Sequence, residues 1–302
     1  MTFADKLREK KKNLKSSSVD TYLRNIRRLR KAVGSLPIPE KHNWLLSEKL
    51  LKWYKQQSLN VRRHLSTAAH VALQAYDVKS EKWNRLMREA MKEYDDERKQ
   101  RKLSTKQKDL IPKGGFDRLK KTISQLKKEF AHLKSLNSVK DLVRYQDLVI
   151  LSLYYEYPLR LDYATLKIEG KKDGNAIVKN KKSPKGWHII LNEFKTKKSE
   201  GAKKFKLNLA NQRILNKFIP AVRKLTSHGY LLSNTRGDRM TKQVLSKRLM
   251  QITSQRIGKK FSVQLLRILY AMKNRGTIET AAEVSDKLLH SQKQSLQYAK
   301  KI

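Results

Sequence analysis

The chain has 302 residues, with 70 lysines and arginines against 27 aspartates and glutamates, which gives a formal net charge of +43. Such a charge repels itself in a compact state and predicts a polyanionic partner whose binding weakens steeply with added salt. The absence of cysteine excludes disulfides, thiolate catalysis and Cys-based zinc sites. The sequence has no membrane-spanning apolar run, no signal-peptide pattern and no lipidation motif, so we expect nucleic acid rather than a membrane as the partner.

Hydrophobic residues make up 38% of the chain, which is enough for helices with one apolar and one charged face. The length allows two domains. We expect residues 1–16 to form a basic N-terminal arm or a frayed helix and 17–98 a helical DNA-binding domain. Residues 99–106, where the periodicity is lost, are the expected linker, and 107–302 the second domain.

The first domain is predicted to consist of helices. Ser18 or Asp20 is the expected cap of the first one, which ends at Gly34. Its apolar positions, Tyr22, Ile26, Leu29 and Val33, share one face. The same periodicity predicts further helices over 43–57, 60–76 and 80–98.

Basic residues dominate the opposite faces of these helices. A run of charge usually marks only a solvated face, but acids are nearly absent from 21–35, which favours phosphate contacts. The residues expected to bind DNA are Arg24, Arg27, Arg28, Lys31, Arg62 and Arg63.

The second domain is predicted to be mostly helical with a small sheet inserted after its second helix. Helical patterns cover 116–136 and 139–156, and short strand-like segments follow at 165–169, 175–178, 187–191 and 204–208. Helical patterns then resume at 209–225, 240–257, 262–274, 278–290 and 292–300. The expected fold class is therefore mainly α with a small antiparallel β-sheet (α+β).

Nucleotide, serine-hydrolase and metal motifs are absent from the sequence. There is no P-loop, no GxGxxG, no GxSxG and no histidine spacing typical of a metal site. We therefore expect no metal and no cofactor.

Two arginines and a lysine suit chemistry on a DNA phosphodiester. Arg160 and Arg267 follow or lie within apolar helical segments, and paired guanidinium groups can clamp the nonbridging phosphate oxygens. Asp162 could instead simply pair with Arg160. Lys195 lies in a predicted β-hairpin with Ser199, Glu200 and Gly201 at its turn, where it could protonate a departing 5′ oxygen; Lys197 or Lys198 could take this role in its place.

The order Arg160, Lys195, Arg267, His290, Tyr298 resembles the tyrosine recombinase or phage integrase family, over most of residues 105–302. The resemblance implies that Tyr298 attacks the phosphorus to form a 3′-phosphotyrosyl link while His290 hydrogen-bonds a nonbridging oxygen. It also implies a core-binding domain at 17–98, a C-shaped clamp on double-stranded DNA, a homotetramer on two duplexes, and religation without ATP or metal.

The segments PLRLDYATLKI and LLHSQKQSLQYAKK look similar to integrases of large DNA viruses and virophages, which implies viral genome integration. We then expect an intracellular protein, in the host nucleus or at a viral replication site, wherever the target DNA lies.

Three positions depart from the family pattern. Gln264 stands where a histidine or lysine is usual, three residues before Arg267, and a glutamine cannot act as a base. Asp162 follows Arg160 by two residues rather than three, and Leu289 replaces the usual glycine before the second histidine. Two alternatives therefore stay open: a type IB topoisomerase-like enzyme, and a catalytically impaired relative that only binds DNA.

Overall fold

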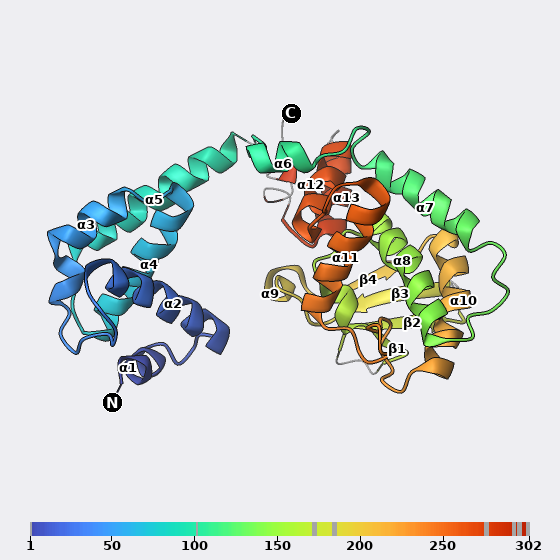
Figure 1. Ribbon diagram of the computed structural model, residues 1–302, viewed down its shortest axis with the longest axis horizontal. Coiled ribbons are helices and arrows are strands. Elements are labelled where there is room, and N and C mark those ends of the chain that lie inside the picture. Colours follow the sequence, from blue (N-terminus) through green and yellow to red (C-terminus); the bar gives the residue numbers. More distant parts are fainter. Residues whose placement is uncertain are drawn as a thin grey trace. The chain divides into compact units, whose positions relative to one another are not determined.

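The computed structural model describes residues 2–100, 102–170, 174–182, 186–274, 278–291, 294, 298 and 299; side chains of 278–282 are not included. The chain divides into two compact units, residues 1–100 and 101–302 (Figure 1). The division falls within the expected linker, 99–106. Each unit has its own hydrophobic core.

Unit 1 is all-helical in its described residues. Its elements are α1 (Phe3–Lys10), α2 (Ser16–Val33), the 3-10 helix η1 (Asn43–Leu46), α3 (Glu48–Lys55), α4 (Leu59–Ala75) and α5 (Glu81–Lys99). The alanine-rich face of α4 lies at the centre, with Ala68, Ala69 and Ala72 fully buried. Small side chains allow close packing, and α4 contacts both α2 and α5.

Three details of unit 1 differ from the prediction. Residues 1–16, expected to be a basic arm or a frayed helix, contain helix α1, whose N-terminus is capped rather than frayed: Thr2 and Asp5 form a capping box and Leu7 is fully buried. Helix α2 starts at Ser16, earlier than a Ser18 or Asp20 cap would allow. The expected helix 43–57 is two elements, since Ser47 caps a new helix by accepting a hydrogen bond from the Leu50 amide.

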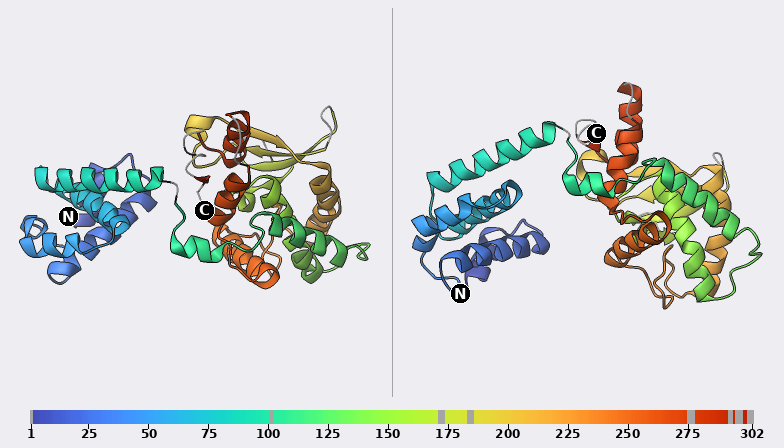
Figure 2. Two further views of the ribbon diagram at one scale, coloured as in Figure 1. Left: turned by 90° about the horizontal axis from the view of Figure 1, so that it is seen from above. Right: turned by 45° about the horizontal axis from the view of Figure 1, so that its top comes forward.

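Unit 2 is built around α8, most of whose residues are buried. Its elements are α6 (Thr105–Leu110), α7 (Asp117–Glu129), α8 (Val139–Glu156), the 3-10 helix η2 (Asp162–Thr165), β1 (Lys167–Ile168), β2 (Ala176–Asn180), β3 (Gly186–Leu191), α9 (Lys197–Glu200), β4 (Lys203–Lys206), α10 (Leu209–Leu225), α11 (Lys242–Ile257), α12 (Val263–Lys273) and α13 (Ile278–Leu288). Helices α7 and α10 pack on α8, and α10 also contacts β3 (Figures 1 and 2).

The predicted fold class, mainly α with a small sheet, is confirmed, but the sheet is mixed rather than purely antiparallel. Its strands run in the order β1-β2-β3-β4. Strands β2, β3 and β4 pair antiparallel, whereas β1 pairs parallel with β2. The two residues of β1 also receive support from the other side, where the Ile168 amide donates to the Gly229 carbonyl.

Two connections in unit 2 were not anticipated. The segment between β3 and β4 is not a simple hairpin turn, because Ser199 and Glu200 belong to the short helix α9, with Gly201 at its C-terminus at φ 69°. Helix α6 follows the linker and is capped by Ser104 and Gln107, a capping-box signature that the sequence does contain. The predicted helix 292–300 lies mostly outside the described residues.

Candidate active site

The C-terminal turn of α13 is the point where the predicted site residues meet. Leu289 adopts a left-handed backbone, at φ 54°, directly after the helix. The His290 amide donates to the Ser285 carbonyl and the Leu289 amide to the Asp286 carbonyl, both at 3.1 Å. These two bonds form a Schellman motif, in which the left-handed residue is usually glycine. The motif fixes the position of His290 relative to α13.

The carbonyls exposed by this turn are each taken by a side chain. Arg267 donates to the Leu288 carbonyl at 2.6 Å, and Thr196 Oγ donates to the Leu289 carbonyl at 2.8 Å. The Ser285 hydroxyl donates to the His290 carbonyl. Helix α12 and the β3–β4 connection are thus both hydrogen-bonded to the end of α13.

Arg267 is an interior residue, with only 2% of its surface exposed. Its second terminal nitrogen donates to the Pro158 carbonyl at 2.6 Å, just before Arg160. Its Nε is buried and has no hydrogen-bond partner. Burial lowers the pKa of the guanidinium, although arginine keeps its charge at neutral pH. Arg267 therefore braces two segments and still has a donor unused.

Arg160 lies in the segment after α8, where the Tyr154 hydroxyl donates to its carbonyl at 2.7 Å. Its Nη2 lies 3.1 Å from His290 Nε2, and its Nη1 is buried without a partner. No ion pair joins Arg160 to Asp162, so simple neutralisation by that acid does not account for this arginine. Burial raises the pKa of Asp162, and the charges of Lys242, Arg160 and Arg267 act against that rise.

His290 is 1% exposed, and its pKa is lowered to about 3. Burial is the main cause, followed by the positive charges of Arg267 and Arg160. The ring is therefore neutral at neutral pH and can accept the hydrogen bond from Arg160. An anion bound between these groups would offset the two arginine charges.

Tyr298 lies against this cluster. Its ring centroid is 5.2 Å from that of His290, and the guanidinium carbon of Arg267 is 5.2 Å from the Tyr298 ring centroid. The structure therefore brings Arg160, Arg267, His290 and Tyr298 together from segments that are distant in the sequence.

Lys195 and Gln264 are both exposed. Lys195 directly precedes Thr196, and its charge contributes to the lowered pKa of His290. Gln264 lies one turn before Arg267 on α12, so it is on the same side of that helix. Among described residues, no hydrogen bond joins either side chain to the two arginines or to His290.

Chemically, the cluster is suited to a tetrahedral anion. Two guanidinium groups each keep a buried nitrogen without a partner, and a neutral imidazole and a phenol lie beside them. Planar guanidinium donors match phosphate oxygens, and burial strengthens each such bond. Sequence reasoning missed Thr196, Ser285 and Pro158 as supports, because their roles depend on contacts across unit 2.

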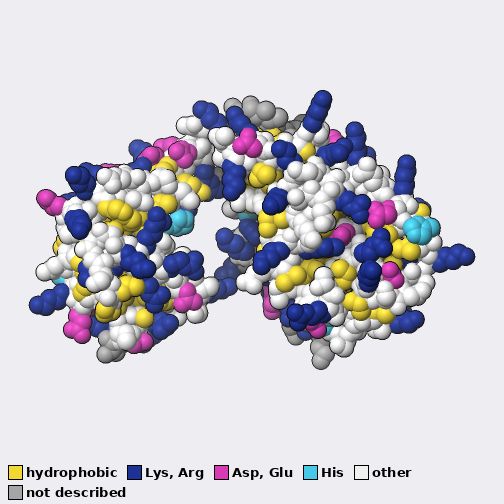
Figure 3. All heavy atoms as spheres, in the orientation of Figure 1, with side chains coloured by type: hydrophobic (Ala, Val, Ile, Leu, Met, Phe, Trp, Pro, Cys, Tyr) yellow, Lys and Arg dark blue, Asp and Glu magenta, His cyan; other side chains and the backbone are white. Residues whose placement is uncertain are grey.

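In unit 1, the predicted DNA-binding residues fall into two groups. Arg24, Arg27, Arg28 and Lys31 are exposed on α2. Their spacing of three and four residues places them on one side of that helix. Lysines and arginines are spread over the visible face of both units (Figure 3).

The other two predicted DNA-binding residues, on α4, have partners within unit 1, as does Arg28, which donates to Gln57 at 3.2 Å and lies over the Trp53 ring. Arg62 makes two hydrogen bonds to Glu93, at 3.1 and 3.0 Å. Arg63 lies with its guanidinium carbon 4.0 Å from the Tyr94 ring centroid. These contacts reduce the charge and the freedom that the pair offers to a phosphate.

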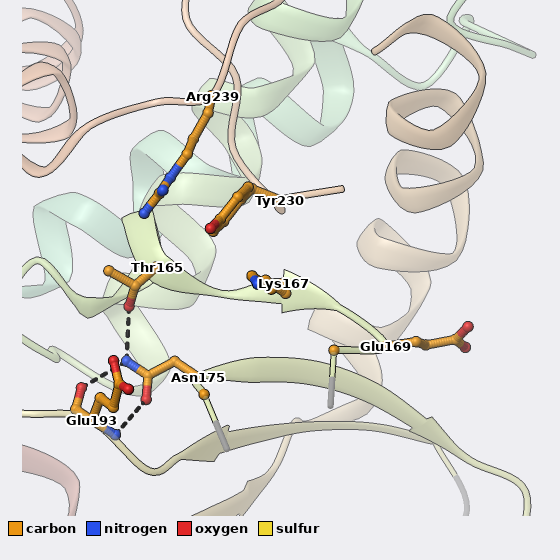
Figure 4. Close-up of a pocket in the computed structure, with 9 residues that line it drawn as sticks. Thr165, Lys167, Glu169, Asn175, Glu193, Tyr230 and Arg239 are labelled. Carbon is orange, nitrogen blue, oxygen red and sulfur yellow. Dashed lines mark hydrogen bonds between the residues drawn. The ribbon is translucent and has the colours of Figure 1, made fainter. Parts of the chain in front are cut away.

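A pocket of about 700 Å³ opens beside β1, apart from the residues of the cluster. Figure 4 shows Arg239 stacked on Tyr230, with 3.8 Å between the guanidinium carbon and the ring centroid. Asn175 is hydrogen-bonded to Thr165 and to the Glu193 backbone. Two acids and two bases line this pocket, so it lacks the uniform positive charge of a phosphate site.

The described part of the chain contains neither a metal-binding cluster nor a membrane-spanning helix. No group of three or more His, Asp or Glu side chains is placed to hold a metal ion. No helix there is both long and apolar enough to cross a membrane.

Neither a scan against protein-family models nor a search of curated proteins finds a match. Solved structures do match. The XerH site-specific recombinase bound to difH substrate has a TM-score of 0.60 and 15% identity, over 95% of this chain and 76% of that one.

Two integrase structures match along most of both chains. A lambda integrase (75–356) dimer bound to a core site has a TM-score of 0.52 and 15% identity, over 96% of this chain and 90% of that one. The Tn1549 transposon integrase in complex with transposon right-end DNA has a TM-score of 0.52 and 15% identity, covering 100% and 96%. From its elements, their order and these matches, the chain has the fold of the tyrosine recombinases and integrases.

Proposed function

We propose that the protein is a site-specific DNA recombinase or integrase that cleaves and rejoins double-stranded DNA through a 3′-phosphotyrosyl intermediate. The observation that carries the proposal is the meeting of Arg160, Arg267, His290 and Tyr298 at the end of α13. The solved structures of similar fold, which include complexes with DNA, support the same reaction class.

In this proposal the scissile phosphate binds between the two arginines. The free N–H groups of Arg160 and Arg267 stabilise the charge that grows on the nonbridging oxygens. The Tyr298 oxygen loses its proton to solvent and bonds to phosphorus as the P–O5′ bond breaks. Lys195 supplies the proton taken by the departing 5′ oxygen. Because the phosphotyrosyl ester keeps the energy of the cleaved bond, rejoining needs no ATP.

Unit 1 is proposed to be the core-binding domain that grips the duplex, with the four basic residues of α2 facing phosphates. The formal net charge of +43 supports DNA as the partner. We further propose a homotetramer acting on two duplexes; a lambda integrase tetramer has been solved bound to a Holliday junction. Viral genome integration, with the protein acting in the host nucleus or at a viral replication site, stays part of this proposal.

The direct test uses a nicked suicide duplex, in which the cleaved strand loses a short fragment and cannot be rejoined. The presumed attachment site, or a pool of random duplexes, serves as substrate. A denaturing gel then reports covalent protein–DNA adduct, and mass spectrometry maps the linked residue. We expect the adduct on Tyr298 and its loss in Tyr298→Phe, with noncovalent binding unchanged.

Tyr230→Phe is the matched control, because it removes a phenol oxygen from unit 2 at a residue that lies in the pocket beside β1. It should form adduct at the rate of the unaltered protein. Adduct formation by Tyr298→Phe would refute the assignment of the nucleophile. Tight, salt-sensitive binding without adduct on any duplex would instead indicate a DNA-binding relative, with Gln264→His the first change to restore activity.

A further inference from the structure

Thr196 stands at the N-cap of α9, yet its side chain does not cap that helix. A threonine at this position normally accepts a hydrogen bond from a backbone amide of the first turn. Here the hydroxyl donates to the Leu289 carbonyl, 93 residues away, at 2.8 Å. The backbone carbonyl of Thr196 is held locally by the amides of Ser199 and Glu200. The side chain therefore links two distant segments at the expense of a local cap.

The two segments joined by this bond carry separate parts of the cluster. Lys195 is covalently next to Thr196, and His290 is covalently next to Leu289. The Leu289 carbonyl belongs to the Schellman turn, whose geometry is fixed by two backbone bonds and by Arg267 on the preceding carbonyl. Thr196 is thus anchored on a rigid acceptor, and Lys195 is one residue from that anchor.

Before Lys195, the chain is held by Phe194, which packs against the core of unit 2, and by Asn175, which is hydrogen-bonded to the Glu193 backbone. After Lys195, the Thr196 hydroxyl bond is what joins this segment to the one that carries His290. Lys195, Lys197, Lys198 and Ser199 are all exposed. A second link to α13 exists, an ion pair of 2.6 Å between Lys203 and Asp286, but it lies on β4 at the far side of α9. An exposed lysine has four rotatable side-chain bonds, so its placement depends on how firmly its backbone is held.

We propose that Thr196 is a positioning residue that fixes the position of Lys195 relative to His290. The proton donor and the phosphate-binding groups can then act on the same phosphodiester. The inference rests on the proposed function. In the step it serves, the P–O5′ bond breaks as the Tyr298 oxygen bonds to phosphorus, and a proton moves from the Lys195 ammonium to the 5′ oxygen. Thr196 contacts none of the reacting atoms.

The test compares two substrates that differ only in the leaving atom. The duplex that yields the Tyr298 adduct is prepared with the ordinary 5′ oxygen, or with sulfur in its place at the cleaved bond. Sulfur departs as a stable thiolate and needs no proton. Single-turnover cleavage is measured for the unaltered protein and for Thr196→Val, which keeps the shape of threonine but has no hydroxyl.

We expect Thr196→Val to cleave ordinary DNA about tenfold more slowly than the unaltered protein, because the hydrogen bond that aligns Lys195 is lost. Its cleavage rate on the sulfur substrate should stay within about twofold of that of the unaltered protein. Thr196→Ser, which retains the donor, should behave as the unaltered protein. Ser199→Ala removes a hydroxyl that bonds only to the Thr196 carbonyl in the same segment, and should also leave both rates unchanged.

Other outcomes overturn the inference in distinguishable ways. If Thr196→Val slows both substrates equally, its role is general folding support and not placement of the proton donor. If it slows neither, the hydrogen bond has no catalytic role. If the unaltered protein forms no adduct on any duplex, the proposed function itself fails, and this inference fails with it.

Discussion

Replacing Arg267 with lysine should destabilise unit 2 while keeping the positive charge. Two guanidinium nitrogens each donate a 2.6 Å bond, one to the Pro158 carbonyl and one to the Leu288 carbonyl. A lysine has a single nitrogen at the end of its chain, so it can serve one of these carbonyls but not both. The other is left buried without a donor, at a cost of about 1–3 kcal/mol, and a charge-assisted bond is lost as well. We expect Arg267→Lys to lower the free energy of unfolding by about 2–4 kcal/mol.

The assay is urea unfolding of the full chain followed by pulsed hydrogen exchange and mass spectrometry, because peptides from 101–302 report unit 2 separately. Arg256→Lys is the matched control. Its partner Glu129 is 2.8 Å away, and the two side chains are 41% and 32% exposed, so solvent screens the pair and the change should cost about 1 kcal/mol or less. A value for Arg267→Lys within about 0.5 kcal/mol of that control would refute the bracing role.

Three further predictions follow from the same structure. The folded-state pKa of His290, about 3, lies below its ordinary value, so the unfolded chain takes up a proton first as pH falls below about 6.5. The contribution of His290 to stability is complete above that pH and is lost toward pH 3. Between pH 7 and pH 5, thermal or urea unfolding should show that the free energy of unfolding falls by about 2 kcal/mol more in the unaltered protein than in His290→Gln. Equal losses would contradict the low pKa of His290. Leu289→Gly should be more stable to urea than Leu289→Ala by about 1 kcal/mol, since both lose the buried side chain but only glycine relieves the left-handed backbone; the reverse order would exclude this strain. Arg27→Ala should reduce the slope of log affinity for duplex DNA against log salt concentration by about 0.9. Arg62→Ala should change this slope less, because Glu93 already pairs with Arg62. Equal changes in slope would show that the ion pair opens when DNA binds.

Local features of the sequence were sufficient to predict most helices. The periodicity of apolar residues located α4, α8, α10 and α12 to within a few residues, because one buried face per helix is a local pattern. The same reasoning failed where local cues were weak. Helix α1 carries a single fully buried leucine, Leu7, whose burial depends on contact with α4.

Strand direction is a second feature that the sequence did not indicate. Alternation of side chains is the same in parallel and antiparallel strands, so nothing local showed that β1 runs parallel to β2. The direction of β1 is set by where the chain leaves η2 and enters the sheet, which depends on the fold of unit 2. Likewise, Thr196 could be read as a residue next to a candidate lysine, but its acceptor lies 93 residues away.

The basic charge, the helical character of both units and the order of the candidate site residues follow from the amino-acid sequence, since each is a property of composition or of local spacing. Three features depend on the fold: Arg160 reaches His290 across 130 residues, Arg267 is buried between two carbonyls, and the pKa of His290 is low. Hydrogen bonds and desolvation depend on which surfaces pack together, and packing brings together segments that are far apart in the chain. Local sequence patterns do not show which distant segments will pack.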